Sequence, residues 1–309
     1  MGEPIRTALW VDPSLAEAAV WRALTVAGPG SVALASHGRR TEPVYEIAST
    51  FERDAAFGRL AQREFEELGL ADPLRQAVSE RPELVALVRV VLVAEARRPQ
   101  EEGVTCEQAG MHLGMRVDAA RFDDRDRLLE WARHVLGHAQ DSLAPDFGFQ
   151  PGWEEDNAGV VRWAMRERLH RLWDVSVDAR LVDEQLLPPG PTCERHRRRL
   201  AGDLPNVDQR TIDAVLELLW NGPRPTFAQL LGWAARPSEL VRAASPSRST
   251  PPRPDRCPLC GFVSDDIGTP DASLSRQVST EYPDWRPESG LCGRCADRYR
   301  FAGRLGGQT

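Results

Sequence analysis

The sequence predicts a helix-rich α+β protein with a large N-terminal part and a small C-terminal module. Three observations lead to this prediction. Several segments repeat apolar residues at helical spacing, one short segment alternates apolar and polar residues as a strand does, and four cysteines form two pairs near the C-terminus. The chain of 309 residues is 41% hydrophobic and 28% charged, which is ordinary for a globular protein long enough for two domains.

Two helices are expected in the first part of the chain. The first covers about residues 14–26, and a clearly amphipathic one covers about 50–68. Ser49 and Glu52 are placed to form the capping box of the second helix, and Gly69 is placed to end it.

The middle of the chain combines strand and helix signals. Residues 84–96 are apolar and β-branched, so they form either a buried strand or a buried helix, and periodicity leaves both open. Residues 111–117 alternate as a strand. A helix then begins after Asp123 or Asp124, either of which can cap it, and runs to about Leu143.

Three more helices and a linker follow. The helices are expected over about residues 156–184, 207–220 and 226–235. Residues 241–254 are rich in Pro, Ser and Arg and have no apolar face, which indicates a linker. We therefore expect one domain over 1–240 and a separate module over 255–309.

Composition disfavours several classes of partner. All 39 basic residues are arginine, and the net charge is −7, whereas nucleic-acid-binding proteins usually present a net basic face. No apolar run approaches the roughly 20 residues that a membrane helix needs, and the N-terminus has no basic-then-apolar signal pattern. We expect a cytoplasmic protein without membrane or nucleic-acid partners.

Four cysteines form the strongest motif. They lie in two Cys-x-x-Cys pairs, Cys257 with Cys260 and Cys292 with Cys295, and a glycine stands beside each pair. This spacing lets one tight turn direct two thiolates at one ion, and four thiolates bind zinc tetrahedrally. The pattern resembles a zinc ribbon, in which one structural zinc supplies much of the folding energy of so small a module. Four unrelated free thiols are the alternative.

A pair of histidines is the second motif. His134 and His138 lie four apart, so they share one face of the expected helix and can reach one metal ion. Zinc peptidases use this spacing with a glutamate directly after the first histidine, but Val135 stands in that place here. Because the chain has six histidines, a pair of exposed or capping histidines is the simpler alternative.

The segment from about residue 85 to 185 resembles the gluzincin branch of the zincin metallopeptidases. The strand expected at 111–117 precedes the histidine helix, and Asp174 and Asp178 lie four apart on the next long helix. The resemblance implies that one of these aspartates is a third zinc ligand and that the other orients a ligand histidine. At the position that corresponds to Asp174, the family usually has Glu. The chain also resembles uncharacterised bacterial proteins that join such a domain to a C-terminal zinc ribbon.

The substitution at Val135 implies an impaired catalytic site. In zincins the glutamate takes a proton from the zinc-bound water, and such proton transfer typically contributes about 10²–10⁴-fold to the rate. Glu130, one turn before His134, and Asp141, nearly one turn after His138, are only weak substitutes, because neither has the place of the missing glutamate.

We therefore expect a zinc-binding protein with a zincin-like, catalytically impaired domain over 1–240 and a structural zinc ribbon over 255–309. The ribbon would hold one zinc ion, and the zincin-like site is a candidate for a second. A peptide or protein is the expected partner. Two alternatives stay open: an active zinc metallopeptidase with a displaced general base, and an interaction protein whose only metal site is the ribbon. A nucleic-acid protein directed by the ribbon is the weaker third.

Overall fold

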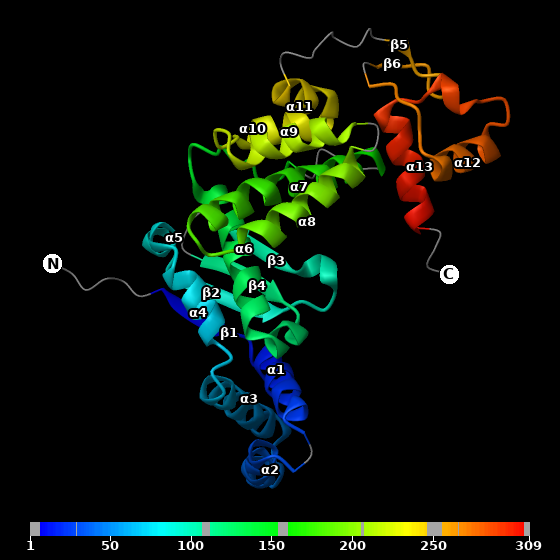
Figure 1. Ribbon diagram of the computed structural model, residues 1–309. Coiled ribbons are helices and arrows are strands. Elements are labelled where there is room, and N and C mark those ends of the chain that lie inside the picture. Colours follow the sequence, from blue (N-terminus) through cyan, green and yellow to red (C-terminus); the bar gives the residue numbers. More distant parts are fainter. Residues whose placement is uncertain are drawn as a thin grey trace. The chain divides into compact units, whose positions relative to one another are not determined.

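The chain folds into two compact units, Met1–Ala144 and Pro145–Thr309. A computed structural model describes residues 7–28, 30–106, 112–153, 160–204, 207–245, 255–264 and 266–305. Both units are rich in helices, and the first also contains a four-stranded sheet (Figure 1). The predicted helix-rich α+β class is therefore confirmed. The domain boundaries expected at 240 and 255 stay a prediction, and most of the expected linker lies outside the described residues.

The sheet of the first unit has the strand order β1-β2-β4-β3. Its strands are β1 (Ala8–Val11), β2 (Val90–Glu95), β3 (Gly103–Cys106) and β4 (His112–Val117). β2 pairs in parallel with both β1 and β4, whereas β3 is an antiparallel edge strand on β4. The strand predicted at 111–117 is thus confirmed from His112 onward, and it precedes the histidine helix.

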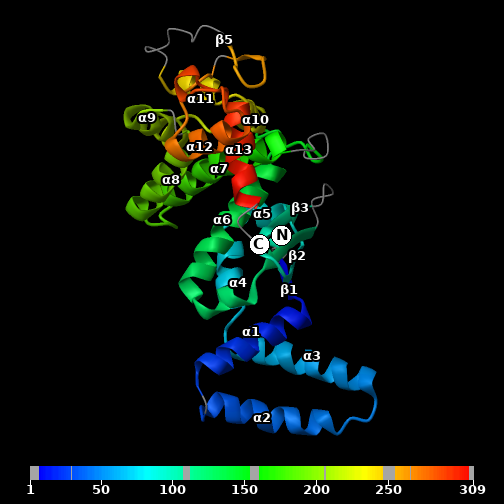
Figure 2. The ribbon, with the colours of Figure 1, turned by 90° about the vertical axis from the view of Figure 1, so that its right-hand side faces the viewer.

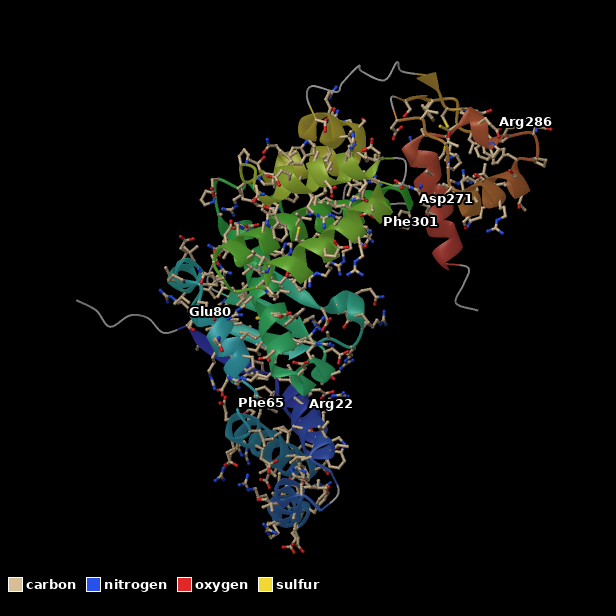
Figure 3. All side chains as sticks on the ribbon, viewed as in Figure 1. Arg22, Phe65, Glu80, Asp271, Arg286 and Phe301 are labelled. Atoms are coloured by element: carbon tan, nitrogen blue, oxygen red, sulfur yellow. The ribbon has the colours of Figure 1, made fainter. Side chains whose placement is uncertain are left out.

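Helices of the first unit bury one shared apolar core with this sheet. They are α1 (Pro13–Val26), α2 (Val32–Tyr45), α3 (Thr50–Glu67), α4 (Asp72–Ser79), α5 (Pro82–Leu87) and α6 (Arg125–Leu143), with short 3₁₀ turns at Pro99–Glu101 and Ala119–Asp123. The core contains Leu15, Leu74 and Leu113, which are fully buried. Phe65 of α3, which Figure 3 labels, packs edge-on against Phe122, and the ring centroids are 5.3 Å apart. α2 is the exception, because it lies on the outer side of this unit, away from the sheet (Figure 2).

Capping and one ion pair fix the position of α6. The Asp124 carboxylate accepts hydrogen bonds from the backbone N–H groups of Asp126 and Arg127, as the capping signal predicted. The Arg133 guanidinium donates two hydrogen bonds of 2.6 and 2.7 Å to the Glu80 carboxylate at the end of α4, and these bonds lower the pKa of Glu80. α6 is therefore held at its start and near its middle.

Residues 84–96 contain the end of a helix followed by a strand, so both structures that the sequence left open are present. α5 ends at Leu87, and β2 begins at Val90. The Ser49 hydroxyl caps α3 by accepting from the Glu52 N–H, and Gly69 follows in the left-handed region at φ 66°. The sequence did not predict α2, whose only buried residue is Thr41.

The second unit is a helical assembly followed by the cysteine module. Its first helices are α7 (Val160–Asp183), α8 (Pro189–Asp203), α9 (Gln209–Trp220), α10 (Phe227–Ala235) and α11 (Pro237–Ala244). An aromatic cluster joins Phe147 to Trp173 of α7 and Phe227 of α10, with ring centroids 4.9 and 6.0 Å apart. The Phe227 N–H also donates to the Phe147 carbonyl at 2.8 Å, so the segment after α6 is anchored on α10. None of the described helices is long and apolar enough to cross a membrane.

Candidate metal centres

The four cysteines converge as a tetrahedral zinc site requires. Their sulfur atoms all lie within 4.8 Å of one another. The sulfurs of Cys257 and Cys295 are 3.8 Å apart, and those of Cys260 and Cys292 are also 3.8 Å apart. A tetrahedron with zinc–sulfur bonds of about 2.3 Å has edges of about 3.8 Å, so this donor set fits zinc. The described residues thus contain a four-cysteine cluster compatible with the predicted zinc ribbon.

Two different backbone devices hold the two pairs. The first pair lies between β5 (Asp255–Arg256) and β6 (Val263–Ser264), which are antiparallel, and the second pair opens α13 (Gly293–Leu305). Gly261 adopts φ +71°, so it needs the left-handed freedom of glycine.

Gly293 instead lies close to the side chain of Asp266. A Cβ at this position would lie 2.4 Å from a carboxylate oxygen of Asp266. That carboxylate accepts the Gly293 N–H at 3.1 Å and so caps the helix that carries the second pair. The Cys295 thiol donates to Cys292, and this hydrogen bond lowers the pKa of Cys292 to about 5 while it raises the pKa of Cys295.

The cysteine module has a small core of its own and one firm contact with α7. The core adds Leu274, Val278 and Trp285 to the cysteines. The Arg168 guanidinium of α7 forms an ion pair with Asp297 of α13, and both side chains are largely buried. Because so few apolar residues are buried, a bound metal would contribute a large share of the folding free energy of the module.

His134 and His138 lie one turn apart on α6 and point to a common place. Their Nε2 atoms are 3.2 Å apart, and their rings meet at 74° with centroids 4.8 Å apart. Two nitrogens bound to one tetrahedral zinc at about 2.0–2.1 Å are separated by about 3.3 Å, so this separation suits two ligands of one ion. Both side chains are half-buried.

The two aspartates of α7 differ in their surroundings. Asp174 is half-buried, and its carboxylate lies 3.9 Å from the Arg199 guanidinium of α8. The buried Asp178 carboxylate instead lies 2.7 Å from His196 Nε2 and accepts a hydrogen bond of 2.9 Å from Arg195. The structure therefore separates two residues that the sequence left equivalent.

The residues considered for the role of general base lie in three environments. Val135 is buried in the apolar core of the first unit at 6% exposure. Glu130 is exposed to solvent, and Asp141 is fully buried. The face of α6 that carries Val135 is thus a packing face.

Sequence reasoning missed the role of His196. The side chain of His196 is 1% exposed and joins α8 to α7 through Asp178. The sequence contained a signal for this buried face, because Thr192, His196 and Leu200 recur every fourth residue and are the buried residues of α8.

Cys106 takes no part in a metal site among the described residues, and burial raises the pKa of its thiol to about 11.

Comparison with known proteins found no similar protein. No family model, no curated protein and no solved structure matches the chain. The candidate metal centres are therefore identified from the geometry of their residues alone.

We predict that Cys292→Ser loses one zinc ion per chain. A serine hydroxyl is a poor replacement for a thiolate, and the remaining three ligands leave the tetrahedron open. Cys193→Ser is the matched control, because Cys193 lies outside the cluster, and it should keep the full zinc content. Elemental analysis of the purified chains measures the difference. Equal zinc in both variants would contradict the four-cysteine site.

We predict that Val135→Glu, which restores the zincin pattern, destabilises the protein. The change removes apolar contacts and buries a carboxylate, so the free energy of unfolding should fall by about 4 kcal/mol or more, against about 2 kcal/mol for Val135→Ala. Burial raises the pKa of the introduced carboxyl, so the folded state binds a proton more tightly than the unfolded state does, and the loss should grow as pH rises from 5 to 8. Urea unfolding at both pH values measures it. Wild-type stability of Val135→Glu would place position 135 in contact with water.

Proposed function

We propose that this protein binds two zinc ions, a structural one at the four cysteines and a second at His134, His138 and Asp174. The second assignment is supported by one observation, which is that the Nε2 atoms of His134 and His138 lie 3.2 Å apart, a separation that suits two ligands of one zinc ion. Asp174 is the proposed third ligand, because Asp178 already binds His196 and Arg195.

The second site is proposed to bind a peptide or protein group without cleaving it. Three protein ligands leave the fourth position of a tetrahedral zinc open, and zinc there acts as a Lewis acid toward a carbonyl oxygen. Residue 135 provides no carboxylate next to this open position, because it is a valine that packs in the core. Proton transfer is therefore the function that this site lacks.

Metal content tests the proposal directly. We expect two zinc ions in the wild type and one in His138→Ala, because one remaining histidine and one carboxylate make too weak a site. Asp174→Asn should also lower the content toward one. Asp178→Asn is the matched control, and we expect it to keep two zinc ions while losing stability, because His196 and Arg195 lose their buried partner. A single zinc in the wild type would favour the alternative of an interaction protein whose only metal site is the ribbon.

We also predict that the wild type does not cleave unstructured peptides. The readout is mass spectrometry of a mixed peptide library after incubation with zinc, with and without a chelator. Cleavage that the chelator stops and that His134→Ala abolishes would support the alternative of an active metallopeptidase. Glu130→Gln would then be the first variant to test for a displaced base, since Glu130 is exposed whereas Asp141 is fully buried.

A further inference from the structure

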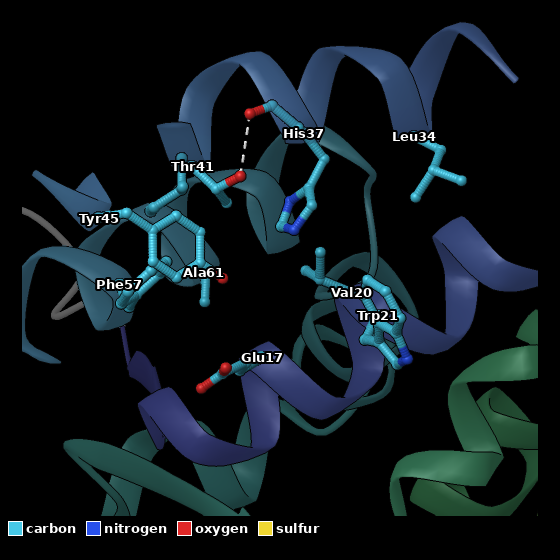
Figure 4. A pocket seen from close by; sticks show the side chains of 11 residues that line it. Glu17, Val20, Trp21, Leu34, His37, Thr41, Tyr45, Phe57 and Ala61 are labelled. Carbon is cyan, nitrogen blue, oxygen red and sulfur yellow. Dashed lines mark hydrogen bonds between the residues drawn. The ribbon is translucent and has the colours of Figure 1, made fainter. Parts of the chain in front are cut away.

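A cavity of about 520 Å³ lies among the first three helices, in the unit that also contains the sheet (Figure 4). This volume is typical of a site for a small organic molecule. Each helix turns one stripe of residues toward it, at spacings of three or four. The lining residues are Glu17, Val20 and Trp21 of α1, Leu34, His37, Gly38, Thr41 and Tyr45 of α2, and Phe57, Leu60 and Ala61 of α3.

Polar contacts attach α2 to α3, beside a few partly buried apolar side chains such as Leu34. His37 Nδ1 lies 2.6 Å from the Glu64 carboxylate of α3, and Arg40 forms ion pairs with both Glu64 and Glu67. Only Thr41 of α2 is buried. These long polar side chains hold the two helices together at their edges, and Gly38 leaves the space between them unfilled, since an added Cβ there would meet nothing within 4 Å.

Aromatic side chains form much of the wall. Tyr45 and Phe57 meet edge-on with ring centroids 5.1 Å apart, and Trp21 lies 6.3 Å from the His37 ring (Figure 4). Trp21 and Tyr45 are 58% and 68% exposed, so they stand at the opening of the cavity. Exposed aromatic faces carry partial negative charge, which attracts organic cations.

The charges of the residues that line the cavity also favour a cation. Glu17 is the one carboxylate among the described lining residues, and none of the described residues forms an ion pair or hydrogen bond with it. The described lining also contains no arginine, although the chain has 39 basic residues, all arginine. Glu64 occupies His37 Nδ1 and thereby fixes the ring, while the ring itself points into the cavity (Figure 4). The lining therefore offers one unpaired negative charge and no uncompensated positive charge.

We propose that this cavity binds an organic ammonium ion that has an apolar body. The charged end would lie against the Glu17 carboxylate and the faces of Trp21 and Tyr45, and the apolar body would lie between Phe57, Val20 and Leu34. A carboxylate beside aromatic faces is the combination that favours such cations over neutral or anionic molecules. The same chemistry is offered by a small free amine and by the basic side chain of another protein.

Binding of matched small probes to the full-length protein tests this proposal. We expect 2-phenylethylammonium to bind with a Kd of about 1 mM or tighter, and 2-phenylethanol and 3-phenylpropionate to bind at least about tenfold more weakly, by calorimetry or saturation-transfer NMR. A second arm compares the N-acetyl methylamides of lysine and arginine with that of norleucine. A clear preference for lysine or arginine in that arm would identify a protein side chain as the source of the cation.

Two variants tie the binding to the cavity. Gly38→Leu should fill the space and abolish binding while the helix keeps its stability, because glycine is a poor helix former and the added atoms meet open space. Gly202→Leu, also in a helix with open space at its Cβ, is the matched control and should bind as the wild type does. Glu17→Gln should weaken ammonium binding about fivefold or more and leave 2-phenylethanol unaffected. The proposal is wrong if ammonium and alcohol bind equally, if Gly38→Leu binds normally, or if no probe binds.

Discussion

The geometry of helix α6 constrains both the core of the first unit and its candidate metal site. Residues 134 and 138 share one face of this helix, and residue 135 points about 100° away from residue 134. In this fold that direction is the core, where Val135 is packed with Leu136 and Ala139. The histidine pair and the core residue at position 135 therefore lie on different faces of one helix, so Val135 packs in the core while the two histidine side chains face each other.

The cysteine module depends on its metal in a different way. The histidine site is built on a helix that a large apolar core already holds in place. The second cysteine pair instead opens a helix whose start is fixed by Asp266, and a Cβ at Gly293 would collide with that carboxylate. Its core is small, so the four thiolates and their ion would be among its main stabilising contacts. One site would gain a metal after folding, whereas the other would fold around it.

Local patterns carried most of the prediction from sequence, and buried polar residues account for its gaps. α3 and α6 were predicted because their apolar residues recur at helical spacing and a serine or aspartate caps each. α8 was missed because its buried face is Thr192, His196 and Leu200, which includes two polar residues. The cysteine cluster follows from spacing along the chain alone. Spacing left Asp174 and Asp178 equivalent, because what distinguishes Asp178 is His196, 18 residues further along the chain.

The function of a charged residue in this protein is decided by its buried partners, which composition does not reveal. Asp178 is occupied by His196 and Arg195 and so acts as a connection between α7 and α8. Glu64 is likewise occupied by His37 and Arg40, and it fixes α2 on α3. In each case a buried carboxylate joins two helices, because its partners are side chains of the neighbouring helix. In a chain with 46 acidic and 39 basic residues, candidate sites are therefore found by asking which carboxylates face other potential ligands or a cavity, and which ones hold two helices together.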